Sequence, residues 1–239
     1  MVDRGAIRRR LTLAVLAAAV LVSPASVRAD DTLPAAFPAA GELIAPAVLV
    51  RARPDPSSRV LRRMAQVRAD LQLQVVLALG ARRGTDGLWW YKVSLPGRPN
   101  GQRGWVQSDL VDVRPVRNRI TVDRGSRTIE VRRVRDGKLL LQSVVAVGKP
   151  GAETPLGRDF YVQSRYVPDD AFFGTFALET SAYSRLTDWP GGGVVGIHGT
   201  SLPQLLGQAV SHGCIRVRNT VATRLKALAP PGTVIDVVP

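Results

Sequence analysis

The residues best suited to chemistry in this sequence are a cysteine and two histidines near its C-terminal end. Cys214 is the only cysteine among the 239 residues, and the only histidines, His198 and His212, lie within 16 residues of it. An imidazole beside a thiol lowers the pKa of the thiol and can return the proton to a leaving amine. The three side chains therefore contain the minimum parts of a cysteine enzyme that transfers acyl groups.

Two glycines lie next to these residues. Gly199 follows His198, and Gly213 precedes Cys214. A residue without a Cβ lets a substrate approach the backbone, and it lets peptide N–H groups converge on a developing oxyanion. We therefore expect an oxyanion hole made of backbone donors and a reaction that needs no cofactor.

Other uses of the same three side chains stay open at this point. His198, His212 and Cys214 are the donor types of a zinc site, but the sequence has no further histidine or cysteine for a closed structural site. Their spacing also lacks a metal signature, so we expect no metal ion. A single cysteine can equally be a small buried apolar residue.

The segments around these residues predict how they are positioned. Residues 194–198 predict a strand that ends in an exposed histidine, and residues 214–217 predict a second strand. Residues 203–210 predict a short helix between the two strands. Asn219 is a candidate N-cap for a further helix, which is followed by a closing strand over 233–238.

Upstream of the cluster, the sequence predicts β-hairpins and one long loop. Strands are expected over 120–122, 128–131, 139–147 and 160–162, with turns between them. Residues 164–190 lack an apolar period and predict a loop with many aromatic residues, namely Tyr166, Phe172, Phe173, Phe176, Tyr183 and Trp189. Such a loop is either a lid over a cleft or a connection that its rings pin to the sheet.

A separate small all-β barrel is predicted over residues 43–115, where short apolar runs alternate with turn signals. The sequences VRARP at 50–54, DGLWWYKV at 86–93 and GWV at 104–106 resemble a bacterial Src-homology-3-like domain. This resemblance implies a role in holding cell-wall material or in positioning a catalytic domain. Trp89 and Trp105 are either exposed stacking residues for a glycan or peptide, or part of the barrel core, and we expect the core.

The residues around Cys214 resemble the signature of the L,D-transpeptidase catalytic domain. The resemblance rests on IHGT at 197–200, SHGCIRV at 211–217 and Asn219, with TPLG at 154–157 upstream. It implies a β-sandwich-like, mostly antiparallel fold with one or two short helices. In that family the cysteine attacks the carbonyl of the third residue of a peptidoglycan tetrapeptide stem, the terminal D-alanine leaves, and an amine of another stem resolves the thioester.

The resemblance also assigns roles to the residues of the cluster. Cys214 is the nucleophile and His198 is its base, with a backbone carbonyl near Gly199 or Ser211 orienting the imidazole. The implied oxyanion hole consists of the backbone N–H groups of His212, Gly213 and Cys214. The side chain of His212 either assists catalysis or supports the loop, and we expect support.

Arg216 and Asn219 are the residues that the resemblance assigns to substrate binding. Arg216 would shape the pocket or meet a substrate carboxylate, and a structural ion pair is the alternative. Asn219 occupies a position that is often polar in the family, but helix capping explains it equally well. The acidic residue that often follows in the family is replaced here by Val221 and Ala222.

The N-terminal end of the chain predicts export. Four arginines within residues 4–10 precede the uncharged apolar run 11–22, and a small-residue site ends at Ala29. This is the pattern of a signal peptide over residues 1–29, with an uncleaved membrane anchor as the alternative. Residues 30–42 predict a linker rich in proline and alanine.

Charge supports the same interpretation. The whole chain has a net charge of +14, and residues 30–239 keep 28 basic and 18 acidic residues. An exported basic protein faces the anionic polymers of an envelope rather than a nucleic acid. Solubility alone also explains an arginine-rich surface.

Together these observations predict a mainly β protein with two domains, a Src-homology-3-like barrel over 43–115 and an L,D-transpeptidase-like domain over 116–239. The expected partners are peptidoglycan stem peptides, with a glycan or an anionic envelope polymer at the barrel, and no nucleic acid. The expected location is the periplasm or the cell wall, and the expected state is a monomer.

Two alternative functions remain open in the sequence. One is a hydrolase of the same family, in which water resolves the thioester. The other is a non-catalytic protein that binds the wall. The family resemblance further implies that carbapenem-type β-lactams form a covalent adduct on Cys214.

Overall fold

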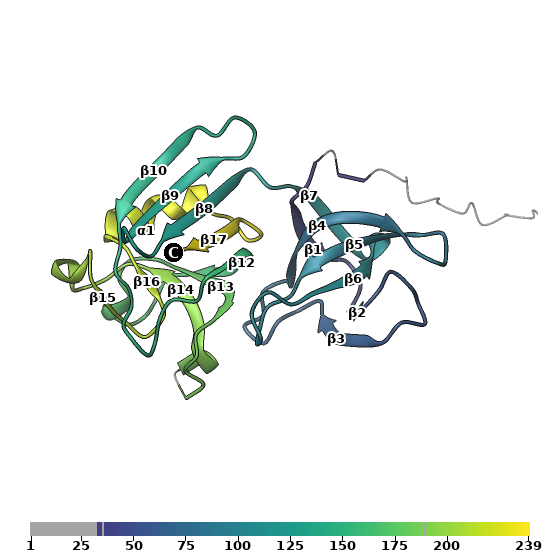
Figure 1. Ribbon diagram of the computed structural model, residues 1–239, viewed down its shortest axis with the longest axis horizontal. Helices are drawn as coiled ribbons and strands as arrows, with labels where there is room; N and C mark the ends of the chain where they lie inside the picture. Colours follow the sequence, from purple (N-terminus) through teal and green to yellow (C-terminus); the bar gives the residue numbers. More distant parts are fainter. Residues whose placement is uncertain (1–32, 35, 189) are drawn as a thin grey trace, which may run out of the picture. The chain divides into compact units, whose positions relative to one another are not determined.

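The computed structural model describes residues 33–34, 36–188 and 190–239 (Figure 1). The predicted signal peptide over 1–29 and part of the predicted linker lie outside these residues. Within the described part of the chain, no helix is both long and apolar enough to cross a membrane. The prediction of a mainly β fold is confirmed, because strands dominate and a single α-helix occurs among the described residues.

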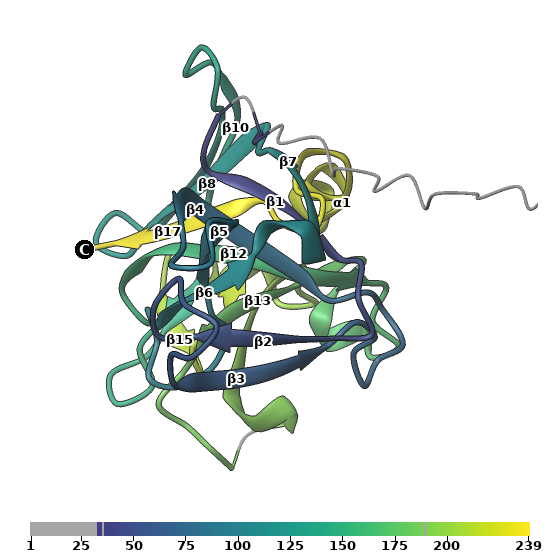
Figure 2. The ribbon, with the colours of Figure 1, turned by 90° about the vertical axis from the view of Figure 1, so that its right-hand side faces the viewer.

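The first half of the described chain forms a seven-stranded antiparallel sheet in the order β3-β2-β6-β5-β4-β1-β7. Alternate side chains point into its interior, so that in β2 Val48 and Val50 are buried whereas Leu49 is 40% exposed. Figure 2 shows β2 and β3 side by side, in agreement with their antiparallel pairing. The strands are β1 (Ala39–Leu43), β2 (Ala47–Arg51), β3 (Val60–Ala65), β4 (Val75–Arg83), β5 (Trp89–Ser94), β6 (Arg103–Gln107) and β7 (Val111–Pro115), and the 3₁₀ turn η1 (Ser108–Leu110) precedes β7.

The tryptophans of this sheet divide between the two roles considered for them. Trp90 is a core residue, with 2% of its surface exposed, and its indole N–H donates to Asp86 Oδ1 at 3.0 Å. Trp89 and Trp105 are half-buried, and the guanidinium of Arg83 lies 4.7 Å from the ring centroid of Trp89. The expectation of a core role is therefore wrong for Trp89 and Trp105, whose rings keep part of their surface in solvent.

The second half forms an eight-stranded sheet in the order β10-β9-β8-β17-β12-β13-β14-β16. Two of its pairs, β17 with β8 and β14 with β16, are parallel. A separate parallel pair joins β11 to β15. The strands are β8 (Asn118–Asp123), β9 (Thr128–Arg133), β10 (Leu139–Val144), β11 (Val147–Gly148), β12 (Gly157–Tyr166), β13 (Ala177–Tyr183), β14 (Val194–His198), β15 (Ala209–Ser211), β16 (Ile215–Arg216) and β17 (Val234–Val238).

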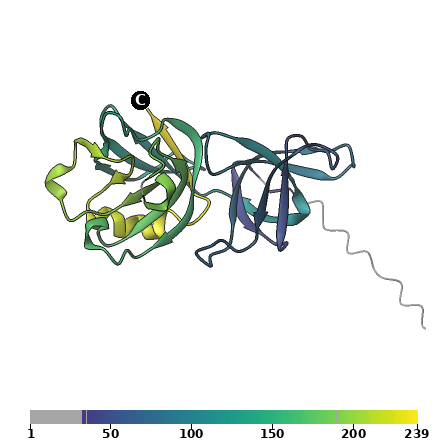
Figure 3. The ribbon, with the colours of Figure 1, turned by 90° about the horizontal axis from the view of Figure 1, so that it is seen from below.

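The core of this second sheet includes the helix α1 (Asn219–Leu228). Figure 3 shows the helix in yellow beside the strands of this sheet. Ala222 and Leu225 of α1 are buried among the apolar side chains of the strands, and Val217, just before the helix, is fully buried with them. Burial of an aliphatic side chain of this kind stabilises the fold by about 1.5–3 kcal/mol. The helix is therefore held by its packing on the sheet, directly after the segment that carries Cys214.

One small apolar cluster joins the two sheets. Leu77 of β4 packs with Tyr161 of β12 and Val234 of β17, and all three are fully buried. The hydroxyl of Tyr161 donates to the carbonyl of Val75 at 3.3 Å, and Arg98, between β5 and β6, donates to the carbonyl of Ser184 at 2.7 Å. The first two contacts join β4 to β12, and the third joins the β5–β6 turn to the segment after β13.

The prediction of one long loop over residues 164–190 is wrong, because the strand β13 lies within it and β12 extends to Tyr166. The sequence of β13 has no apolar run, because Thr180 and Ser181 lie in its middle. Both side chains are nevertheless buried. Thr180 Oγ1 donates to the carbonyl of Val195 at 2.7 Å, and Ser181 Oγ accepts from the N–H of Tyr161 at 3.0 Å. Neighbouring strands thus satisfy polar groups that made the segment look like a loop.

The prediction of a helix over 203–210 is also wrong. A 3₁₀ turn, η4 (Pro203–Leu205), is followed by Gly207 at φ 87° and then by β15. A left-handed residue of this kind ends a helical segment. Two further 3₁₀ turns, η2 (Ala171–Phe173) and η3 (Pro190–Gly193), flank β13.

Candidate active site

Cys214 lies in the tight turn between β15 and β16, and its thiol is half-buried. The hydroxyl of Ser211 shapes this turn, because its Oγ accepts from the N–H of Gly213 at 3.2 Å and donates to the carbonyl of Cys214 at 2.6 Å. Gly213 has φ 115°, and a Cβ on it would lie 2.7 Å from Cβ of Ser184. The turn therefore requires glycine immediately before the cysteine.

A threonine on the loop after β11 also stabilises this turn by hydrogen bonds. Thr154 is fully buried, and its Oγ1 accepts from the N–H of Gly148 at 2.9 Å and donates to the carbonyl of Gly213 at 2.9 Å. Sequence analysis used TPLG at 154–157 only as part of the family resemblance and did not predict the hydrogen bonds of Thr154. Its hydroxyl links β11 to the cysteine turn.

His198 is the last residue of β14, and it is 3% exposed rather than exposed as its strand-end position predicts. Its Nδ1 lies 2.6 Å from the carbonyl oxygen of Gly199, one of the two carbonyls expected to orient it. The ring of Phe173 covers it edge-on, with the ring centroids 5.0 Å apart. This packing fixes the imidazole and excludes water from it.

Gly196 is the residue that brings the ring and the sulfur to the same space. Its N–H lies 3.3 Å from Sγ of Cys214. A Cβ placed on Gly196 would lie 3.7 Å from Cδ2 of His198 and 3.8 Å from that sulfur. A glycine inside a strand marks a close approach of another group, which is the signal that this position carried in the sequence.

The resting pair is neutral. Burial lowers the pKa of His198 to about 4. Burial also raises the pKa of the Cys214 thiol, against the opposing effects of the Gly196 N–H and the charge of Arg216. These directions favour a neutral thiol and a neutral imidazole at rest, so the proton has to move as the sulfur attacks.

A cavity of about 360 Å³ opens in front of the sulfur. Its wall is mostly apolar and aromatic, with one carboxylate among the described residues that line it. Sequence analysis named Tyr166 and Phe173 only as part of an aromatic segment, and nothing in the sequence singled out Glu179. The lining consists of Tyr166, Phe173, Ala177, Glu179, Gly191, Val194, Gly196, His198 and Cys214.

Arg216 of β16 is paired in register with His198 and is 7% exposed. Its guanidinium stacks on the ring of Phe172, 4.7 Å from the centroid, and Phe172 contacts Phe173 edge-on. Among the described residues, no carboxylate forms an ion pair with Arg216, and its Nε is buried without a hydrogen bond. The alternative of a structural ion pair is therefore wrong for the described part of the chain.

Asn219 is the first residue of α1 and not its N-cap, which is Arg218. Its Oδ1 accepts from the N–H of Thr200 at 3.0 Å and from the N–H of Thr175 at 3.4 Å. The side chain therefore ties the loop after His198 to the segment before β13. The N-cap prediction is wrong, because the amide oxygen of Asn219 accepts hydrogen bonds from these two loops instead of from the first turn of the helix.

His212 is half-buried, and it does not line the cavity that contains Cys214. Burial lowers its pKa, and the charges of Lys149 and Arg216 act in the same direction. A larger hollow of about 430 Å³, lined by Arg124, Gly148 and Glu153 among others, contains neither Cys214 nor His198. Within the described residues, no group of three or more histidine, cysteine or acidic side chains could hold a metal ion.

A thiol and a buried imidazole that face one cavity on a β-sheet are the arrangement that cysteine-dependent acyl transfer requires. Residues 117–237 match the L,D-transpeptidase catalytic domain family, also called YkuD. The protein belongs to this family.

Two relatives carry the name L,D-transpeptidase YkuD. The Bacillus licheniformis protein is 33% identical over 150 residues, which are 60% of this chain and 82% of the relative. The Bacillus subtilis protein is 30% identical over 161 residues, which are 67% of this chain and 90% of the relative. Among solved structures, L,D-transpeptidase 3 from Mycobacterium tuberculosis is 15% identical with a TM-score of 0.45, over 70% of this chain and 92% of that chain.

Proposed function

We propose that the protein is a peptidoglycan L,D-transpeptidase that transfers an acyl group from a tetrapeptide stem to an amine through a thioester on Cys214. The observation that carries this proposal is the convergence of His198 Cδ2 and Cys214 Sγ on the space above Gly196. Membership of the family supports it independently.

His198 is the general base. Because its Nδ1 donates to the carbonyl of Gly199, Nε2 is the unprotonated nitrogen that can accept the thiol proton. Sγ attacks the carbonyl carbon of the third stem residue while Nε2 takes the proton. The S–C bond forms, and the C–N bond to the terminal D-alanine breaks as the imidazolium gives the proton to the leaving amine.

The second half of the reaction restores the thiol. The neutral amine of an acceptor stem attacks the thioester carbonyl, a new C–N bond forms, and the C–S bond breaks. The proton of the amine returns to sulfur through His198. Because thiol and imidazole are neutral at rest, His198 takes the proton only as Sγ attacks, and it returns the proton in the later step.

The oxyanion is stabilised by backbone donors of the cysteine turn. We assign the oxyanion to the backbone N–H groups of His212, Gly213 and Cys214, of which the N–H of Gly213 also donates to Ser211 Oγ at 3.2 Å. In this assignment the side chain of His212 supports the loop, and Arg216 shapes the pocket by stacking on Phe172.

The first sheet has a separate role in this proposal. We assign residues 43–115 to a Src-homology-3-like barrel that binds a glycan or an anionic envelope polymer, and residues 116–239 to the catalytic domain. The half-buried rings of Trp89 and Trp105 are its candidate stacking surface. Export through a signal peptide over residues 1–29 would place both in the periplasm or the cell wall.

The product of the reaction tests the proposal and separates it from hydrolysis. Purified protein is incubated with a defined tetrapeptide substrate, and the muropeptides are analysed by mass spectrometry. Crosslinked dimers that Cys214→Ala does not form are the expected result. Trimmed stems without dimers would show the hydrolase alternative, and no product with folded protein would contradict an enzymatic function.

A further inference from the structure

The cavity in front of Cys214 contains a carboxylate that the proposed reaction does not use. Glu179 of β13 is paired in register with Gly196, whose N–H contacts the sulfur. Its side chain is 25% exposed and lines the cavity. Tyr166 and Cys214 line the same cavity, so the three side chains face one space.

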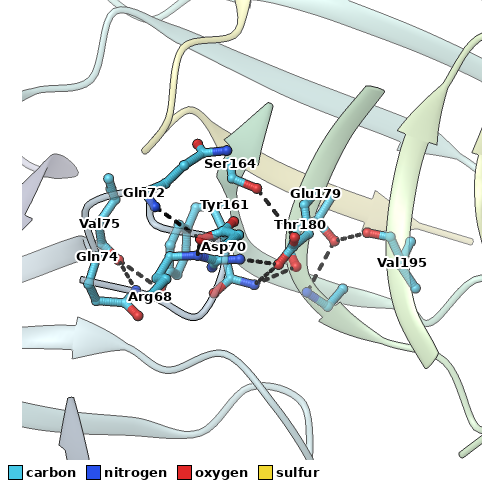
Figure 4. A network of polar contacts seen from close by, with 12 residues as sticks. Arg68, Asp70, Gln72, Gln74, Val75, Tyr161, Ser164, Glu179, Thr180 and Val195 are labelled. Carbon is cyan, nitrogen blue, oxygen red and sulfur yellow. Dashed lines mark hydrogen bonds and ion pairs between the residues drawn. The ribbon is translucent and has the colours of Figure 1, made fainter. Parts of the chain in front are cut away.

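An arginine from the first sheet holds this carboxylate. Arg68 Nη2 donates to Glu179 Oε1 at 2.6 Å, and Arg68 Nε donates to Asp70 Oδ1 at 3.1 Å (Figure 4). Arg68 lies in the tight turn between β3 and β4, where its N–H donates to the carbonyl of Gln72 at 2.9 Å. With 14% of its side chain exposed, it is nearly buried between the two carboxylates.

The other oxygen of Glu179 is still able to accept a hydrogen bond. Oε1 receives Arg68 and a long contact of 3.4 Å from Gln163, whereas Oε2 receives, from the part of the chain that the structure describes, only the hydroxyl of Ser164 at 3.3 Å. A carboxylate oxygen accepts up to two hydrogen bonds. Oε2 is therefore open to a donor from the cavity.

The charge of this group points to the chemistry of its ligand. Arg68, Asp70 and Glu179 together carry one net negative charge, within a chain whose net charge is +14. A carboxylate near a nucleophilic cysteine disfavours the thiolate, so it does not serve ionisation of the sulfur. A bound cation would cancel that effect and would gain a charge-assisted hydrogen bond.

We propose that Glu179 binds a primary ammonium group of the peptidoglycan stem, and that Arg68 of the first sheet is the residue that positions it. This inference rests on the proposed function. The ammonium has two sources, the side chain of the third residue of the donor stem and the amine of the acceptor stem. The first sheet would then take part in substrate selection by way of Arg68, in addition to any wall binding.

The test removes the carboxylate of the protein and the amine of the substrate, separately and together. Thioester formation is measured with a synthetic tetrapeptide whose third residue has a free side-chain amine, and with the same peptide acetylated on that amine. If the donor amine is bound, Glu179→Gln raises the KM for the free amine about tenfold, whereas the two proteins have equal KM values for the acetylated peptide. If the acceptor amine is bound, the same increase occurs in the KM for the acceptor in the second half of the reaction.

Arg68 is tested through the same readout. Arg68→Gln is expected to raise the same KM as Glu179→Gln does, and Arg68→Lys is expected to restore part of the loss, because it keeps the charge but not the fork that reaches both carboxylates. A merely structural role of Arg68 would lower activity with the free and the acetylated peptide by the same factor. Glu130→Gln is the matched control, since Glu130 of β9 carries the same charge, lies outside the cavity lining and pairs with Arg132.

The outcomes separate this inference from the proposed function. Thioester formation by the wild type, together with KM values for Glu179→Gln within twofold of wild type in both half-reactions, would overturn the inference alone. A folded wild type that forms no thioester with either peptide would overturn the proposed function and this inference with it.

Discussion

The two sheets of the protein alternate buried and exposed residues in the same way, yet they treat polar side chains differently. Among the described residues, the first sheet and its turns bury only Ser58 and Ser94. The second sheet and its loops bury Thr154, Gln163, Ser164, Thr180, Ser181, Ser184, His198, Thr200, Ser211, Arg216, Thr233 and Asp236. Burying a polar group is costly unless it is hydrogen-bonded. The difference therefore indicates that hydrogen bonds fix the positions of side chains mainly in the second sheet.

Three of these polar groups act at the cysteine turn and at the strand that ends at His198. Ser211 and Thr154 fix the turn, and Thr180 fixes β13 against β14. The first sheet has no comparable set of buried polar contacts among its described residues. We therefore expect substitutions in the first sheet, Arg68 apart, to change stability alone. Substitutions in the second sheet, which positions the reacting groups, should also change the acylation rate.

The largest effect is expected at His198. His198→Gln should lower the rate of thioester formation about 10³-fold, because it removes the general base. His212→Gln should keep most of the rate, since His212 does not line the cavity. Stopped-flow acylation kinetics measure both, and a larger loss at His212 than at His198 would reverse the assignment.

A methyl group at Gly196 should have the next largest effect. It meets His198 and Cys214 only at ordinary contact distances of 3.7 and 3.8 Å, so Gly196→Ala should fold normally. It nevertheless fills the space between the reacting groups, and we expect a loss of about 10²-fold in the acylation rate.

Gly80 in β4 of the first sheet is the matched control for this substitution. A Cβ on Gly80 has no neighbour within 4 Å, so Gly80→Ala should leave both the acylation rate and the melting temperature unchanged. Equal rates for the two alanine variants would show that the space above Gly196 is not used in the reaction.

A smaller effect is expected when one buried hydroxyl is removed from each sheet. Thr154→Val leaves the N–H of Gly148 and the carbonyl of Gly213 without their partner, which should cost about 1–3 kcal/mol of stability. The loosened cysteine turn should also lower the acylation rate roughly tenfold.

Ser58→Ala is the comparison in the first sheet. Its hydroxyl accepts from the N–H of Arg53 at 2.9 Å, so its loss should cost about 1 kcal/mol with no change in the acylation rate. Thermal unfolding and acylation kinetics distinguish the two variants. If Ser58→Ala changed the acylation rate as much as Thr154→Val does, the two sheets would not differ in how they support the reaction.

The pH dependence comes last, because it has no effect at neutral pH and develops only as the solution is acidified. Since the folded pKa of His198 is about 4 and the ordinary value is 6.5, the unfolded chain takes up this proton first as the pH falls. Stability should therefore be complete above pH 6.5 and should decrease by about 3 kcal/mol between pH 6.5 and 4.

Denaturant titrations measure this dependence, and His198→Gln should flatten it over the same interval. The rate of acylation by the wild type should fall only as the pH approaches about 4, where the base becomes protonated. A decline already centred near pH 6.5 would indicate an imidazole that is not buried.

Sequence analysis predicted what is local and missed what is tertiary. The strand up to His198 follows from residues adjacent in sequence, whereas the strand expected over 214–217 is shorter, because Cys214 itself lies in the turn before β16. The carbonyl of Gly199 beside the imidazole was implied by the family resemblance. β13 was missed, because its buried threonine and serine are satisfied by other strands.

The contact between Arg68 and Glu179 could not have been predicted, since 111 residues separate its partners and neither lies in a recognisable motif. The neutral state of the thiol and imidazole was missed for the same reason. It depends on burial by Phe173, which folding brings over the ring of His198.

The central claim is that Cys214 is the nucleophile, and covalent labelling tests it most directly. The folded protein and its Cys214→Ala variant are incubated with a carbapenem, and intact mass spectrometry with peptide mapping locates any adduct. The account predicts one adduct per wild-type chain, on Cys214, and none on the variant. A folded wild type that stays unmodified, or an adduct that persists in Cys214→Ala, would contradict it.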